Sequence, residues 1–140
     1  MKEAQLQILF GRYLIANPSC ESEMHELKRT NKPSLPFSAV RPEQEKRLLR
    51  IKQDGYYYLK ISDSPIYKGM KTRFTKPKDA DSLFVRINAV YIVVFFYKPR
   101  KQKIAYCIDI ENWINERKRS KRKSLTEDRA DFIATLTRSI

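Results

Sequence analysis

The longest uninterrupted apolar run of the chain, Ala89 to Tyr97, has the length of a β-strand and consists largely of Val, Ile, Tyr and Phe. It is well short of the roughly 20 apolar residues that a membrane-spanning helix needs. Leu83–Ile87 precedes it and Lys103–Ile110 follows it, with similar compositions. The last two runs predict a hairpin that turns at Lys98-Pro99-Arg100-Lys101. The chain is therefore expected to build a sheet.

Helical patterns alternate with these strands. Apolar residues recur at three- and four-residue spacing near the N-terminus, and Pro42 and Gly55 suit the first turn and the end of a second helix. Asp109 suits the cap of a third helix, and Ser124-Leu-Thr-Glu127 fits a capping box for a fourth. The predicted helices are residues 3–16, 42–54, 110–119 and 124–136; the other strands are 22–30 and 56–61, with loops at 31–40 and 62–81. This order predicts one mixed α/β domain over residues 1–140, with a basic helical segment from about residue 111.

The charge of the chain points to a polyanionic partner. Lysine and arginine total 29 against 16 acidic residues, which gives a formal net charge of +13. Nucleic acid is the leading partner for a small domain that carries so much charge, and an anionic membrane surface is the second. Cys20 and Cys107 lie far apart without Cys-x-x-Cys spacing, which excludes a zinc ribbon and indicates a reducing compartment. With no signal-peptide pattern at the N-terminus, a soluble intracellular protein is expected.

The triplet Glu26-Leu27-Lys28 is the main candidate for chemistry. Residues two apart in a strand share a face, so a carboxylate and an ammonium group project side by side. Nucleases that cut phosphodiesters use a carboxylate to hold a hard cation and a lysine to stabilise charge on the phosphate. Such pairs are abundant, and taken alone the triplet fits a solvated strand face better.

A catalytic Mg²⁺ needs a second carboxylate. Asp79 and Asp81 stand immediately before the strand at Leu83, where either could complete a metal site or merely neutralise neighbouring lysines. Glu3 and Gln44 lie on the buried stripes of their helices, and Glu3 either frays into solvent or points inward at a site. His25 is expected to face away from Glu26 and to be a packed or solvent-bonded imidazole, not a ligand.

Two basic clusters are candidates for phosphate contact. Residues 117–123 hold six cations in seven positions, and a second cluster lies between residues 68 and 78. Such clusters neutralise phosphates without reading sequence, although most short charge runs are solvated linkers. The predicted nucleic-acid contacts are Lys76, Lys78, Arg117, Lys118, Arg119, Lys121, Arg122 and Lys123.

The order of several motifs resembles the small phage-encoded Holliday junction resolvase-like members of the PD-(D/E)XK nuclease superfamily. The similar segments are Glu26-Leu-Lys-Arg-Thr, Ser34-Leu-Pro-Phe-Ser38, the helix with Gln44, Lys76-Pro-Lys78 with Asp81, Ile108-Asp109 and Ser120-Lys-Arg-Lys-Ser-Leu-Thr126. The resemblance covers about Glu3 to Ala134. It implies a restriction-endonuclease-like fold and a metal-dependent endonuclease that cleaves branched DNA, such as a Holliday junction.

The resemblance also implies roles for single residues. Glu26 would bind Mg²⁺ or Mn²⁺ together with Asp81, Lys28 would be the catalytic lysine, and Gln44 and Glu3 would complete the catalytic set. Since a junction needs two symmetric cuts, a homodimer is expected, in the cytoplasm of a prokaryotic or phage-infected cell. The sequence departs from the family where Glu43 replaces a histidine before Gln44. It also lacks room for the hairpin that usually carries an aspartate before the Glu-x-Lys strand. We expect Asp81 to supply this missing carboxylate from a later strand.

The sequence is also compatible with other functions. A non-catalytic DNA- or RNA-binding protein would explain the charge without an active site, and convergence of Glu26, Lys28 and Asp81 would argue against it. Gly55-Tyr-Tyr57 with Tyr67-Lys-Gly69 faintly resembles a GIY-YIG signature, but that signature normally opens its domain. A role at a membrane surface would need a basic amphipathic helix, and the basic run has no apolar face. Tyr56, Tyr57 and Tyr58 fit either stacking on unpaired bases or packing within a sheet.

Overall fold

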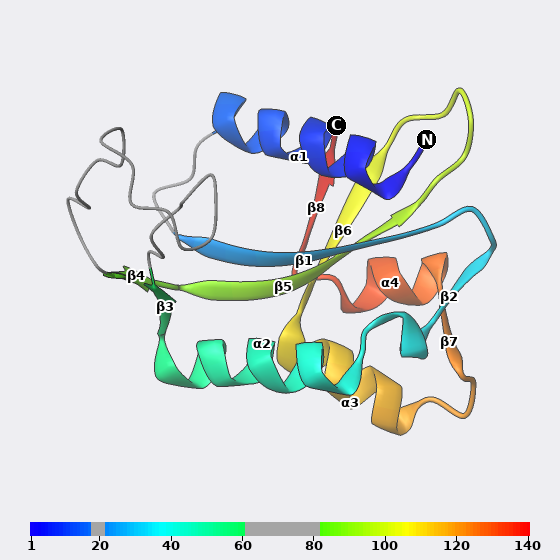
Figure 1. The fold of residues 1–140 in the computed structure, drawn as a ribbon. Coiled ribbons are helices and arrows are strands. Elements are labelled where there is room, and N and C mark those ends of the chain that lie inside the picture. The colour runs from blue at the N-terminus through cyan, green and yellow to red at the C-terminus, as the bar shows by residue number, and fades with distance from the viewer. Residues whose placement is uncertain (18–21, 61–81) are drawn as a thin grey trace, which may run out of the picture.

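The computed structural model describes residues 1–17, 22–60 and 82–140, which form a mixed α/β fold. The helices are α1 (Glu3–Ala16), η1 (Phe37–Ala39), α2 (Pro42–Asp54), α3 (Ile110–Arg119) and α4 (Glu127–Ile133). The strands are β1 (Glu23–Thr30), β2 (Ser34–Pro36), β3 (Tyr56–Lys60), β4 (Ser82–Arg86), β5 (Ala89–Phe96), β6 (Ile104–Asp109), β7 (Ser124–Thr126) and β8 (Leu136–Ser139). A central sheet in the order β1-β5-β6-β8 lies between α1 on one side and α2 and α3 on the other (Figure 1).

Strand β5 is an inner strand of this sheet, between β1 and β6. It pairs with β1 in parallel, with Glu26 opposite Ile92, and with β6 in antiparallel fashion, with Val93 opposite Cys107. The antiparallel pairing confirms the predicted hairpin at residues 98–101. Strand β8 adds to the far edge, antiparallel to β6. Two short antiparallel pairs, β2 with β7 and β3 with β4, lie outside the central sheet.

The sheet divides the apolar core in two, because successive strand residues face opposite sides. On one side Val90, Ile92 and Val94 pack with α2, α3 and the fully buried Trp113. On the other side Tyr91, Val93 and Phe95 pack beneath α1. Glu26 and Lys28 of β1 lie in register with Ile92 and Val94, so they share the side that α2 covers.

Three predicted helix boundaries are confirmed. Pro42 begins α2, and Gly55 follows it with a φ of 75° while its N–H donates to the Ile51 carbonyl at 2.9 Å. This left-handed conformation is the one that glycine adopts without steric cost. Asp109 caps α3, since its side chain accepts a hydrogen bond from the Glu111 N–H at 2.9 Å.

The predictions for the C-terminal segment and the loop at 31–40 are partly wrong. Residues 124–126 form strand β7, and Thr126, not Ser124, caps the short helix α4 by accepting from the Arg129 N–H. The chain then forms β8 instead of extending the helix to Leu136. Residues 34–36, predicted as loop, form β2, which pairs with β7 across a long sequence separation. Within the described ranges, no helix is long and apolar enough to span a membrane.

Candidate functional site

Glu26, Lys28 and Gln44 meet where β1 passes the first turn of α2. The Lys28 Nζ lies 3.1 Å from the Glu26 Oε1, and the Gln44 Nε2 donates to the same oxygen at 2.8 Å. The Lys28 and Glu26 side chains keep 15% and 19% of their accessible surface, so neither is fully buried. The structure therefore brings these three predicted site residues together, whereas Asp81, the other member of the expected convergence, lies outside the described residues.

The position of Gln44 follows from the start of α2. Its side-chain Oε1 accepts a hydrogen bond from the Arg41 N–H at 3.1 Å. Backbone N–H groups at a helix start lack helical partners, and a side chain of the first turn commonly satisfies one. With Oε1 used in this way, the amide group of Gln44 turns its Nε2 donor toward Glu26. The helix start therefore holds the donor that orients the Glu26 carboxylate.

The two oxygens of Glu26 differ in their surroundings. Both contacts just described fall on Oε1, and no residue in the described part of the chain donates to Oε2. Carboxylate oxygens are the ligand type that Mg²⁺ and Mn²⁺ take from proteins. Residues 1–17, 22–60 and 82–140 contain no cluster of three or more acidic, histidine or cysteine side chains that would hold a metal. Within these ranges Glu26 therefore belongs to no such cluster.

The other predicted site residues lie apart from this group or outside the described residues. Glu3 is exposed in the first turn of α1, so the expectation that it points inward is not met. The helix α1 also covers the opposite side of the sheet from Glu26. Asp81, Lys76 and Lys78 lie outside the described residues, and so does Asp79.

His25 is packed beneath α1, as the sequence predicts. Its Nε2 lies 2.9 Å from the Glu23 Oε2, and its ring meets Phe10 edge-on and stacks on Tyr91. Burial lowers the pKa of His25, although the Glu23 carboxylate works in the opposite direction. Arg138 of β8 completes the group by donating to both oxygens of Glu23, at 3.0 and 3.1 Å. This group ties the last strand to the first.

The basic run, residues 117–123, occupies the end of α3 and the loop that leads to β7. Arg117 is held by Glu45 of α2 through a pair of hydrogen bonds. The Arg119 Nη2 lies 3.3 Å from the Glu116 Oε2. The remaining cations of the run, Lys118, Lys121, Arg122 and Lys123, are exposed, and no acid among the described residues lies within ion-pair distance of them. These four are the better candidates for phosphate contact.

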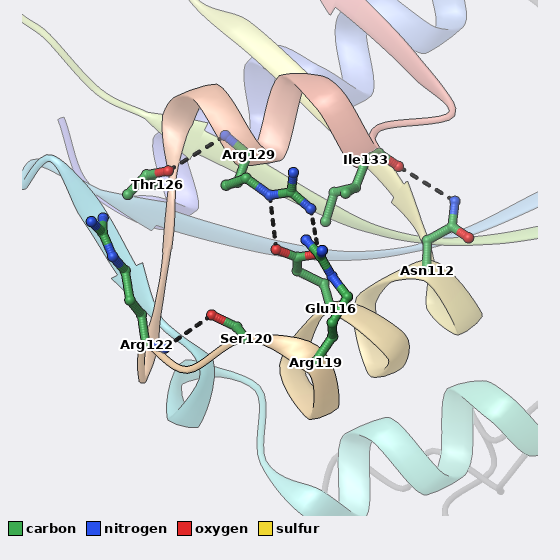
Figure 2. Close-up of polar contacts among 8 residues, drawn as sticks. All are labelled: Asn112, Glu116, Arg119, Ser120, Arg122, Thr126, Arg129 and Ile133. Carbon is green, nitrogen blue, oxygen red and sulfur yellow. Dashed lines mark hydrogen bonds and ion pairs between the residues drawn. The ribbon is translucent and has the colours of Figure 1, made fainter.

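A pocket of about 520 Å³ opens beside this run, between α3 and α4. Figure 2 shows Glu116 between the guanidinium groups of Arg119 and Arg129. The Arg129 hydrogen bonds hold the pKa of Glu116 below its usual value, although burial works against them. The lining combines cations with hydroxyl groups: Arg119, Lys121, Arg122, Arg129, Ser120, Ser124 and Thr126.

Sequence reasoning missed Glu116 and Arg129 as parts of this basic surface. Their contact at 2.8 Å joins two helices across a turn and a short strand, so local periodicity gives no sign of it. The only signal is the three-residue spacing of Glu116 and Arg119, which places them on one side of α3.

No protein-family model, curated protein or solved structure matches the chain in comparisons with all three. The case for a function therefore has to come from the residues and their geometry.

Proposed function

We propose that the chain is a metal-dependent endodeoxyribonuclease with a restriction-endonuclease-like fold, which cleaves branched DNA such as a Holliday junction as a homodimer. The observation that carries the proposal is the contact of Glu26, Lys28 and Gln44 on one side of β1. A protein that only binds nucleic acid has no reason to direct a carboxylate toward a phosphate, because the two repel each other unless a cation lies between them.

In this mechanism Glu26 and Asp81 would hold Mg²⁺ or Mn²⁺. The bound cation supplies positive charge and a water of lowered pKa. The ammonium group of Lys28 lies beside the carboxylate and stabilises the negative charge that grows on the phosphate oxygens. A water would add to phosphorus and release a proton to solvent, the bond to the leaving oxygen would break, and that oxygen would take up a proton from solvent. Gln44 keeps the Glu26 carboxylate turned toward the substrate, with Oε2 available to the cation.

The basic run would hold the substrate. Lys118, Lys121, Arg122 and Lys123 present charge over a short stretch of surface, and such contacts are made to phosphates whatever the sequence. The chain also carries a formal net charge of +13. A four-way junction suits this mode of recognition, since its shape and backbone distinguish it from linear duplex. The symmetry of the junction favours a dimer with two sites.

The test is cleavage of an end-labelled synthetic four-way junction, with linear duplex of the same sequence beside it, in Mg²⁺ and in EDTA. We expect nicks on the junction in Mg²⁺ alone, and a loss of roughly 100-fold or more in Glu26→Gln and Lys28→Ala. Glu111→Gln is the matched control, since this exposed carboxylate on α3 contacts Lys52 and not the site.

The outcomes separate the candidate functions. Equal cutting of linear duplex would retain the nuclease and remove junction specificity. Tight binding without cleavage in Mg²⁺ would contradict the proposal and favour a non-catalytic nucleic-acid-binding protein, which the basic run supports as the second candidate. Cleavage that survives Glu26→Gln would show that the active site lies elsewhere.

A further inference from the structure

The two-stranded ribbon of β3 and β4 carries aromatic side chains on its surface that no core explains. Tyr56, Tyr58 and Phe84 keep 45%, 49% and 69% of their accessible surface. Tyr57 alone among the three consecutive tyrosines packs against the core beneath α2. Exposed aromatic groups are costly in water, and a cluster of them commonly marks a binding surface.

The register of the ribbon places these rings together on one face. Tyr58 lies opposite Phe84, and residues directly opposite in an antiparallel pair share a face. The Phe84 ring centroid lies 4.9 Å from that of Tyr58 and 5.6 Å from that of Tyr56. The three rings therefore form a continuous aromatic surface, which we call the aromatic face.

Cations stand at both ends of the aromatic face. Arg86 lies opposite Tyr56, and Lys60 lies two residues beyond Tyr58 on the same face, opposite Ser82. Both cations are exposed. The other face of the ribbon is different in kind: beside Tyr57 it carries the aliphatic side chains of Leu59, Leu83 and Val85. Aromatic and cationic groups thus occur together on one face only.

We propose that the aromatic face binds unpaired nucleobases by stacking, while Lys60 and Arg86 contact the phosphates on either side. Proteins that hold single strands combine aromatic side chains, on which any base can stack, with cations that follow the backbone. The charge of the surface favours this polyanion over an apolar protein partner, because a second apolar face would leave Lys60 and Arg86 without complementary charge. The inference goes beyond the proposed function, and it requires no cleavage.

The test measures binding of fluorescein-labelled oligothymidylate in EDTA, beside a strand of equal length with abasic sites in place of most bases. The two strands carry the same phosphates, so the difference in their affinities reports stacking. We expect wild-type protein to prefer the strand with bases, and Phe84→Leu and Tyr58→Leu to weaken that binding about tenfold with little effect on the abasic strand. Lys60→Ala should weaken both strands and reduce the dependence on salt.

Phe132→Leu is the matched control, because Phe132 is an equally exposed ring, at 76%, that lies on α4 and contacts Arg129. It should bind both strands as wild type does. Circular dichroism and thermal unfolding verify that each variant is folded, as expected for changes at such exposed positions.

Equal affinity of wild type for the two strands, or full binding by Phe84→Leu, would overturn the inference. A shift from dimer to monomer in Phe84→Leu, with binding unchanged, would assign the aromatic face to a second copy of the chain instead. Glu26→Gln separates this inference from the proposed function: it should abolish cleavage and leave base-dependent binding intact. If neither wild type nor any variant cleaves DNA, but wild type still prefers the strand with bases, the proposed nuclease activity is wrong and the stacking surface is retained.

Discussion

Two carboxylates in this chain are both held by cations, and they are held in different ways. Glu116 is buried, and Arg119 and Arg129 together donate to both of its oxygens at 2.8 to 3.3 Å. Glu26 keeps 19% of its side-chain surface, and its contacts with Lys28 and Gln44 both reach Oε1. Both oxygens of the first carboxylate accept hydrogen bonds, whereas the second retains an oxygen toward which no described residue donates.

In the proposed function, this difference separates a structural group from a reactive one. A saturated carboxylate anchors its partners: Glu116 fixes two arginines at the wall of the pocket beside the basic run. An oriented carboxylate with one oxygen left can take up a cation, and its neighbouring lysine can act on a bound phosphate. Charge and composition are similar in the two groups, so the geometry of the contacts carries the distinction.

The largest effect on stability should come from Glu116→Gln. Removing the charge from a buried carboxylate that receives several charge-assisted hydrogen bonds is expected to cost about 2 kcal/mol of unfolding free energy. Glu26→Gln should cost less than about 1 kcal/mol, because its pair is part-exposed and screened. Urea unfolding of both variants, in EDTA, measures the contrast. Equal losses would show that the two carboxylates do not differ as we describe.

Gln44→Ala should have a smaller effect. It should change the Mg²⁺ concentration that cleavage requires, and not the stability of the fold. Gln44 positions Glu26, and loss of a group that orients a metal ligand commonly costs tenfold or somewhat more in metal affinity. The Mg²⁺ concentration for half-maximal cleavage is therefore expected to rise about tenfold, with cleavage restored at high Mg²⁺. Gln53→Ala, an exposed position near the end of the same helix, is the control. An unchanged Mg²⁺ requirement in Gln44→Ala would remove Gln44 from the site.

The smallest effect should appear in the pH dependence of the unfolding free energy of Glu116→Gln at acidic pH. The pKa of Glu116 is lowered in the folded chain by hydrogen bonds from Arg129, so its contribution to stability is complete above the unfolded pKa and is lost as pH falls through the folded pKa. Unfolding free energy measured between about pH 3 and pH 7 should thus decline less steeply below about pH 4.5 in Glu116→Gln than in wild type. Parallel curves for the two proteins would contradict this account of Glu116.

The pairing of Glu26 with Lys28 could be predicted because its geometry is local, whereas the role of Gln44 at the site is implied by the family resemblance. Glu26 and Lys28 share a face through the two-residue period of a strand, and Gln44 lies near the inward side of a helix with clear start and stop signals. The inward placement expected for Glu3 is wrong, since its side chain is exposed. Residues in a first helical turn sit at the end of the buried stripe, where solvent competes with packing.

The short strands escaped prediction because their partners are distant in the chain. Ser124-Leu-Thr126 reads as the start of a helix, and its strand conformation depends on pairing with residues 34–36. Likewise β8 depends on the free edge of β6 and on the reach of Arg138 to Glu23. Tertiary pairing of this kind overrides local preference and leaves no periodic signal in three or four residues.

The most direct test of the central claim is binding of Mn²⁺ to the metal-free protein, followed by the loss of the free-ion signal in electron paramagnetic resonance. The account predicts one class of site in wild type, retained in folded Glu116→Gln and in Glu111→Gln, and lost in Glu26→Gln. Binding by Glu26→Gln with the affinity of wild type would contradict it, because the carboxylate with the available oxygen would then hold no metal.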